Sequence, residues 1–177
     1  MLLLINGPPG VGKSTIARRY LDDHPRSLIV EVGTLRTQLG RWSRDEASKQ
    51  LARDLAVDLI EGHLRRRYDV VVPQYLGRPE FRDRLSTVAT QAGAPFVEVM
   101  LAAPTADTVD RFRARRYALD RAEHPEADVP DDAVLAAIAD AVDRLAADGD
   151  PTRIAVDASG DVETTYDALV LALAGGG

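Results

Sequence analysis

The sequence predicts an α/β fold in which a five-stranded parallel sheet is flanked by helices. Short apolar segments alternate with longer segments of helical periodicity, which is typical of parallel strands joined by crossover helices. Several of the apolar segments are continuous rather than alternating, as expected where both faces of a parallel sheet are covered. The chain of 177 residues is close to one domain of roughly 150 residues, so we expect a single domain over residues 1–177.

Each element has a signal of its own. We predict strands at residues 2–6, 28–32, 69–73, 95–101 and 153–157, and helices at about 13–22, 44–67, 79–92, 105–119, 131–147 and 162–174. Asp161 precedes the last helix, and Asp131 and Asp132 place negative charge at the amino end of another, where the helix dipole favours it.

The long helix at 44–67 has an apolar face. Leu51, Leu55 and Leu59 recur at helical spacing. We expect them, together with Ile60 and His63, to form one apolar stripe packed against the sheet.

Composition excludes several kinds of site. The chain has no cysteine, so disulfides, thiolate catalysis, zinc–thiolate sites and iron–sulfur clusters are excluded. His24, His63 and His124 are too scattered to suggest a histidine metal site. The formal net charge of −6 argues against a nucleic-acid partner, because no excess of positive charge is available to neutralise phosphates.

No targeting or membrane segment is expected. The apolar start at residues 1–5 lacks a basic flank and is too short for a signal peptide. No run approaches the roughly 20 apolar residues that cross a bilayer. We therefore expect a cytoplasmic protein without a membrane partner, and the sequence leaves its oligomeric state open.

The strongest motif follows the first predicted strand. Residues 7–14, GPPGVGKS, fit G-x-x-x-x-G-K-[ST] without a mismatch and open the first predicted helix. Glycines let backbone amides converge on phosphate oxygens, while Lys13 reaches the β- and γ-phosphates and Ser14 can ligate Mg²⁺. The residues expected to bind the nucleotide are Gly7, Pro8, Pro9, Gly10, Val11, Gly12, Lys13, Ser14 and Thr15.

Other phosphate-loop classes fit less well. A GTPase needs an Asn-Lys-x-Asp element to read guanine, and the chain has none. Transporter-type and ring-forming ATPases need further modules, for which 177 residues leave little room. Compact kinases, which bind ATP and an acceptor side by side in one domain, are left.

On this motif and its order of elements, the chain resembles the small-molecule P-loop kinases. These include shikimate and gluconate kinases, chloramphenicol phosphotransferase, tunicamycin-resistance proteins, zeta-type toxins and proteins often labelled AAA family ATPase. The resemblance covers essentially the whole length, although only the phosphate loop is highly specific. It implies a three-layer P-loop NTPase fold with a short lid at about 112–130, and ATP and Mg²⁺ as cofactors.

Two acidic positions of the group differ here. Relatives usually end the second strand in an Asp-x-Asp-like element whose second Asp acts as general base or orients the acceptor. Here Glu31 holds the first acidic place and Gly33 stands where the base is expected. Glu31 either substitutes as a catalytic carboxylate or is an ordinary strand-end residue. Many relatives have an acid for Mg²⁺ after the third strand, where this chain has the neutral Gln74.

The resemblance also suggests an acceptor pocket. Ligands in open α/β sheets bind beyond the carboxyl ends of the strands, and four side chains are expected there: Arg36, Gln74, Tyr75 and Arg78. The alternatives are that Arg78 is an exposed arginine at a helix start and that Tyr75 only packs.

Residues 110–116, DRFRARR, resemble the R-x-x-x-R element at the start of the lid. Arg111 and Arg115 are four residues apart and so share a helix face. Aimed into the ATP site, Arg115 would stabilise charge on the transferring phosphoryl group, and one of the two could stack on adenine. The alternative is an arginine-rich surface helix. The polar segment 120–130, with two prolines, is either the rest of the lid or a surface loop.

These residues lead to two hypotheses. The first is an ATP- and Mg²⁺-dependent phosphotransferase that acts on a hydroxyl of a small molecule. The alternative is a nucleotide-binding sensor or partner module with little or no kinase activity, which Gly33 and Gln74 motivate. Plain ATP hydrolysis coupled to a partner stays open as well.

Overall fold

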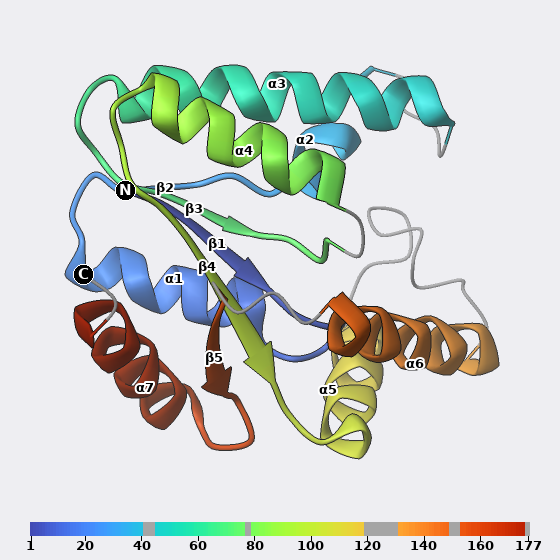
Figure 1. Ribbon diagram of the computed structural model, residues 1–177. Coiled ribbons are helices and arrows are strands. Elements are labelled where there is room, and N and C mark those ends of the chain that lie inside the picture. The colour runs from blue at the N-terminus through green and yellow to red at the C-terminus, as the bar shows by residue number, and fades with distance from the viewer. Residues whose placement is uncertain (41–44, 77–78, 119–130, 149–152, 176–177) are drawn as a thin grey trace.

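The computed structural model describes residues 1–40, 45–76, 79–118, 131–148 and 153–175 (Figure 1). Within these residues the chain forms one sheet of five strands in the order β2-β3-β1-β4-β5, and every neighbouring pair is parallel. The strands are β1 (Leu2–Asn6), β2 (Leu28–Ile29), β3 (Val70–Pro73), β4 (Phe96–Ala102) and β5 (Ile154–Asp157). The predicted parallel sheet of five strands is thereby confirmed.

Helices cover both faces of this sheet, with α3 and α4 on one side and α1 and α7 on the other (Figure 1). The helices are α1 (Lys13–Asp23), α2 (Val32–Thr37), α3 (Glu46–Leu64), α4 (Pro79–Gln91), α5 (Thr105–Ala118), α6 (Asp131–Asp148) and α7 (Val162–Gly175). No described helix is both long and apolar enough to span a membrane.

The alternation of β1 side chains divides the core in two. Leu2 and Leu4 pack with α3 and α4, whereas Leu3 and Ile5 pack with α1 and α7. All four leucine and isoleucine side chains are fully buried. A central parallel strand covered on both faces has no polar side, which is why β1 reads as a continuous apolar run.

The prediction that the leucines of the long helix pack against the sheet is wrong. Leu51, Leu55 and Leu59 are 49%, 37% and 47% exposed. The buried face of α3 is the neighbouring one, formed by Ala52, Ala56, Val57, Ile60 and Leu64. Small alanines let this face approach the sheet and α4 closely, and the leucine row lies beside it. His63, expected on the same stripe, is half-buried, with its Nε2 2.7 Å from the carbonyl oxygen of Arg26.

The second strand is shorter than predicted, because α2 begins at Val32, immediately after the extended Glu31. This short helix was not predicted. It turns the chain away from the sheet edge and brings its side chains beside α3.

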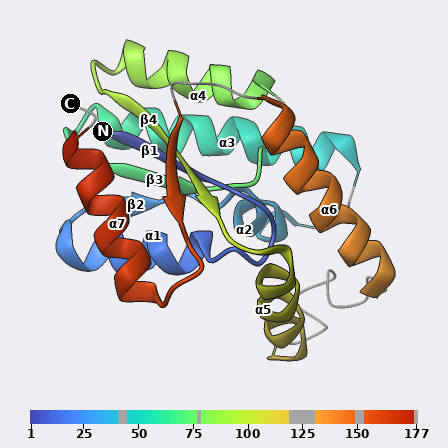
Figure 2. The same ribbon diagram turned by 60° about the horizontal axis from the view of Figure 1, so that its bottom comes forward.

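Helices α5 and α6 belong to neither layer and lie at the carboxyl ends of the strands (Figures 1 and 2). They pack on each other through Val109, Phe112 and Ile138. Of the predicted lid at 112–130, residues 112–118 belong to α5. Residues 119–130 lie outside the described part of the chain.

Candidate functional site

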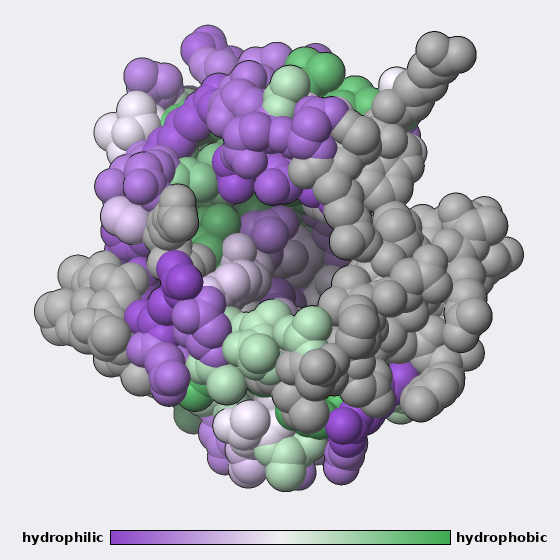
Figure 3. All heavy atoms as spheres, turned by 90° about the vertical axis from the view of Figure 1, so that its right-hand side faces the viewer, coloured by the Kyte–Doolittle hydropathy of each residue, from purple (hydrophilic) through white to green (hydrophobic). Residues whose placement is uncertain are grey.

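The molecule is hollowed at the carboxyl ends of its strands (Figure 3). Two cavities meet there. The first, the phosphate cavity, has a volume of about 510 Å³ and is lined by Pro9, Gly10, Gly12, Lys13, Ser14, Thr15, Pro73, Gln74, Tyr75 and Arg111. It lies at the edge of the sheet where open α/β folds bind their ligands.

The phosphate loop is built around the amino end of α1. Gly12 is the N-cap of that helix and offers no side-chain cap, so the amides of the first turn can serve a bound anion. The Lys13 ammonium group folds back over the loop and donates to the carbonyl oxygens of Gly7 and Pro8 at 2.9 and 2.8 Å. A flexible ammonium group in this position can turn to a phosphate oxygen, which is a stronger acceptor than a carbonyl.

Two positions of the loop require glycine, both because of their backbone conformation and because neighbouring backbone atoms leave no room for a Cβ atom. Gly7 and Gly10 have φ angles of 144° and 88°, which other residues rarely adopt. A Cβ atom on Gly10 would lie 2.1 Å from the carbonyl oxygen of Thr108, and one on Gly7 would lie 2.7 Å from that of Leu101. The loop is therefore wedged against β4 and α5, which fixes the shape of the cradle.

Asn6 ties this loop to the segment after β3. Its Oδ1 accepts hydrogen bonds from the amides of Gly7 and Leu76, at 2.8 and 3.0 Å. Its Nδ2 donates to the carbonyl oxygen of Leu76 at 3.2 Å and to Glu98 Oε1 at 2.9 Å. One buried side chain thus holds the start of the phosphate loop and the wall opposite it in a fixed relation.

Glu98 in turn holds Asn6. Its carboxylate is 1% exposed and forms ion pairs with Arg82 of α4 and with Arg153, the latter at 3.1 Å. A buried carboxylate needs such partners, because an unpaired charge in the interior is costly. Sequence reasoning missed this network, since its members come from four distant segments.

Arg111, which is expected to bind the nucleotide, lies on the wall of the phosphate cavity. Its guanidinium group donates to the carbonyl oxygens of Ala158 and Ser159, at 2.9 and 3.3 Å, and so joins α5 to the loop after β5. This contact holds one side of the cavity in position. Arg115 also belongs to α5, but its side chain lies outside the part of the structure that is described.

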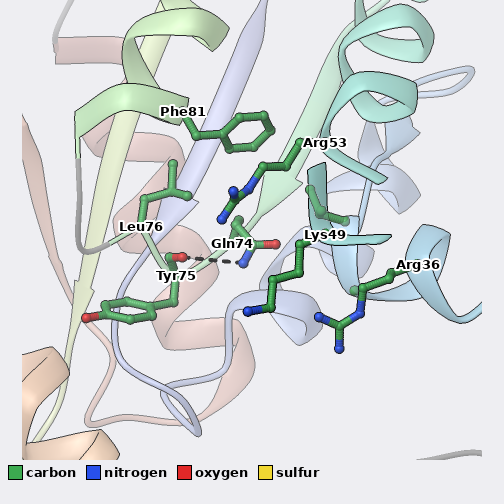
Figure 4. A pocket seen from close by; sticks show the side chains of 9 residues that line it. Arg36, Lys49, Arg53, Gln74, Tyr75, Leu76 and Phe81 are labelled. Carbon is green, nitrogen blue, oxygen red and sulfur yellow. Dashed lines mark hydrogen bonds between the residues drawn. The ribbon is translucent and has the colours of Figure 1, made fainter. Parts of the chain in front are cut away.

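The second cavity, the acceptor cavity, has a volume of about 190 Å³ and adjoins the first at Gln74 and Tyr75. Its lining is Val32, Gly33, Arg36, Lys49, Arg53, Gln74, Tyr75, Leu76 and Phe81. Figure 4 shows Lys49 and Arg53 reaching from α3 to either side of Gln74, and Arg36 reaching from α2. The Gln74 amide is held by a 3.3 Å hydrogen bond to the carbonyl oxygen of Tyr75.

A wider outer part continues from the acceptor cavity between α3, α4 and α6. It has a volume of about 540 Å³ and is lined by Glu46, Arg53, Tyr75, Leu76, Glu80, Phe81, Asp140 and Arg144. Burial raises the pKa of the Tyr75 phenol, which Arg144 lowers and Asp140 raises to a lesser extent. Tyr75 therefore stays protonated at neutral pH and can donate a hydrogen bond.

Glu31 faces a different part of the surface. It is the N-cap of α2, and its Oε2 accepts a 3.0 Å hydrogen bond from the Thr34 hydroxyl. It lines a separate groove at the sheet edge, with Leu35 and Leu59 among its neighbours. The structure does not bring Glu31 into the phosphate or the acceptor cavity.

The remaining predicted residues divide into three groups. Arg36, Gln74 and Tyr75 come together in the acceptor cavity. Gly7, Pro8 and Val11 are buried and shape the loop without lining the phosphate cavity. Arg78 lies outside the described residues.

Two cations of the acceptor cavity were missed. Lys49 and Arg53 are 40% exposed on α3, and sequence reasoning treated that helix only as a packing element. One signal was available, because Lys13 and Lys49 are the only lysines in the chain, and each lines one of the two cavities.

The chain matches a known family over most of its length. Residues 2–145 match the family described as AAA domain. No curated protein matches the sequence significantly.

Solved structures share the fold at low sequence identity. A gluconokinase from Sinorhizobium meliloti 1021 superposes with a TM-score of 0.64 at 18% identity, over 97% of this chain and 90% of that one. The tunicamycin resistance protein of Deinococcus radiodurans gives 0.62 at 22%, over 99% and 95%. The deoxyadenosine kinase of M. mycoides gives 0.60 at 16%, over 99% of each chain.

Proposed function

Because the chain belongs to the AAA domain family and has the fold of the P-loop kinases, we propose that it transfers the γ-phosphoryl group of ATP to a hydroxyl of a small molecule. The observation that carries this proposal is the junction of two cavities at Gln74 and Tyr75. A phosphoryl donor in the loop and an acceptor in the second cavity would meet there, as an in-line transfer requires.

The phosphate cavity fits a nucleoside triphosphate. The uncapped start of α1 and the glycines at positive φ present amides to phosphate oxygens, and Lys13 adds a mobile cation. Ser14 lines the same cavity and is the residue that would ligate Mg²⁺. The metal would neutralise charge on the β- and γ-phosphates. Arg115 is proposed as a second cation for the transferring group.

In the transfer, the acceptor oxygen forms a bond to the γ-phosphorus while the bond to the β–γ bridging oxygen breaks, and ADP leaves with the electron pair. The hydroxyl proton passes to water, since none of the described residues that line the two cavities is Asp or Glu. Phosphoryl transfer depends mainly on positioning and electrostatic stabilisation, so it can proceed without a strong base.

The test is Lys13→Ala, assayed by ADP release with a panel of hydroxylated acceptors. We expect turnover to fall by about 10²–10³-fold, as for loss of one charged transition-state donor. Arg18→Ala, an exposed position on the same helix, is the matched control and should keep the wild-type rate. Full activity in Lys13→Ala would refute the role of the phosphate loop in transfer.

A nucleotide-binding module with little catalysis is the second candidate. It is favoured by Gly33, which adds no side chain to the acceptor cavity, and by the neutral Gln74 at the junction. Calorimetry with ATP and ADP, alongside the turnover assay, separates the two functions. Tight ATP binding with no phosphoryl transfer to any acceptor would support the module and overturn the kinase.

A further inference from the structure

The acceptor cavity concentrates positive charge. Arg36, Lys49 and Arg53 all line it, and no described residue of its lining is acidic. The whole chain has 28 acidic and 22 basic residues, so three cations without an acid in one small cavity depart strongly from the composition of the rest of the molecule. Charge of one sign inside a concave site concentrates ligands of the opposite sign.

The neighbouring carboxylate does not cancel this charge. Glu46 Oε2 lies 3.2 Å from Lys49 Nζ and Glu46 Oε1 lies 3.7 Å from Arg53 Nη1, so one acid serves two cations. Glu46 is itself 73% exposed and lines the wider outer part but not the acceptor cavity. With one negative charge against two positive ones, Glu46 does not balance Lys49 and Arg53 at the end of the cavity next to the junction with the phosphate loop.

The acceptor cavity and its outer part, together called the cleft, differ in the charge of their lining. Its inner cavity carries the three cations, whereas its outer part is lined by Glu46, Glu80 and Asp140 as well as by Arg53 and Arg144. An anionic group would be attracted to the inner end and repelled from the acids of the outer one. The apolar side chains of Leu76 and Phe81 line both parts and offer a surface to the uncharged body of a ligand.

We propose that the phosphoryl acceptor carries an anionic group, a phosphate or a carboxylate, that binds between Arg36, Lys49 and Arg53. This inference rests on the proposed function and names the class of its substrate. The same cations would offset the repulsion between an anionic acceptor and the triphosphate at the junction. A neutral acceptor would gain nothing from this concentration of positive charge.

The first test measures binding without turnover and uses the two lysines as reporters. Reductive ¹³C-methylation keeps their positive charge and gives one lysine signal from each, assigned with the Lys49→Arg variant. With ADP and Mg²⁺ saturating the phosphate cavity, inorganic phosphate and D-gluconate are titrated. We expect a saturable shift of the Lys49 signal with both, weakened about tenfold or more in Arg53→Met, and none with uncharged D-glucitol.

The second test compares acceptors matched except in charge. D-gluconate is paired with D-glucitol, and deoxycytidine monophosphate with 5′-O-methyldeoxycytidine, whose single free hydroxyl is likewise the 3′-hydroxyl, so the two pairs separate carboxylate from phosphate recognition. We expect the charged member to be preferred. Lys49→Met and Arg53→Met should each raise its KM by about 10- to 100-fold, the range for a lost hydrogen bond to a charged group, with the KM for ATP unchanged and Lys49→Arg restoring binding.

Arg84→Met is the matched control, because Arg84 of α4 is equally exposed but pairs with Asp54 of α3 and lines neither the acceptor cavity nor its outer part. Preference for the uncharged acceptors, or a rise in the KM for ATP instead of that for the acceptor, would overturn the inference and leave the kinase proposal standing. If no acceptor is phosphorylated, the proposed function fails and the lysine titration alone decides. An unshifted Lys49 signal refutes the anion site.

Discussion

Gly33 is the single residue with the clearest consequence for the chemistry. It lines the acceptor cavity at the place where related kinases are expected to carry a base. No atom lies within 4 Å of the position that its Cβ would take, and its backbone conformation does not demand glycine. A carboxylate could therefore be introduced here without steric conflict.

We predict that Gly33→Asp raises kcat with a hydroxyl acceptor, because a positioned base commonly contributes about 10²–10⁴-fold and the described residues that line the two cavities include no Asp or Glu. The new charge also faces Arg36, Lys49 and Arg53, so the KM of an anionic acceptor should rise at the same time. Steady-state kinetics separates the two effects.

Gly33→Asn is the control for shape. It should leave kcat at the wild-type value, since an amide cannot take the proton. If Asp and Asn change kcat equally, the effect is steric, and the idea that a base at position 33 speeds the transfer is refuted.

The helix α3 shows how one element can carry two apolar rows. Its exposed row of leucines and its buried row of alanines, with Ile60 and Leu64, both repeat at helical spacing. Periodicity alone favours the larger side chains. In the structure the smaller side chains are buried, because close packing of α3 on β3 and α4 needs a narrow face. Lys49 and Arg53 reach the acceptor cavity from the same helix.

For this helix we predict that Ile60→Ala lowers the free energy of unfolding by about 2–5 kcal/mol, the cost of a cavity at a fully buried site. Leu55→Ala, on the exposed row, should change it by less than about 1 kcal/mol, because little buried surface is lost. Urea denaturation measures both. Equal losses would mean that the leucine row is covered in solution.

In the molecule as a whole, Glu98 joins segments that are far apart in the sequence and lie around the two cavities. Through Arg82, Arg153 and Asn6 it connects β4 with α4, with the start of β5 and with the phosphate loop. The shape of the phosphate and acceptor cavities therefore depends on a buried ion-pair network whose charged members line neither cavity.

We predict that Glu98→Gln lowers the free energy of unfolding by about 3–5 kcal/mol, because two arginines lose their shared charge in the interior. Glu163→Gln is the matched control. Glu163 pairs with Arg19 at the surface, where it is 65% exposed, and its loss should cost at most about 1 kcal/mol. Similar values for the two variants, measured by urea unfolding, would contradict a structural role for Glu98.

The sequence alone determined the features that depend on neighbouring residues. The strand, glycine loop and helix start of residues 2–15 are local in the chain, and local spacing is enough to predict their conformation. The parallel sheet followed for the same reason, since continuous apolar runs and crossover helices repeat along the chain. Arg36, Gln74 and Tyr75 were placed by their position after strands.

Only the tertiary structure decided which distant side chains share a cavity. Lys49 and Arg53 lie on a helix whose position beside β3 no local pattern encodes. The link from Asn6 to Glu98 spans 92 positions, and Glu31 turned away because an unpredicted helix begins after it. The fold could therefore be predicted from the sequence. The concentration of positive charge in the acceptor cavity could not, because it depends on side chains that come together only in three dimensions.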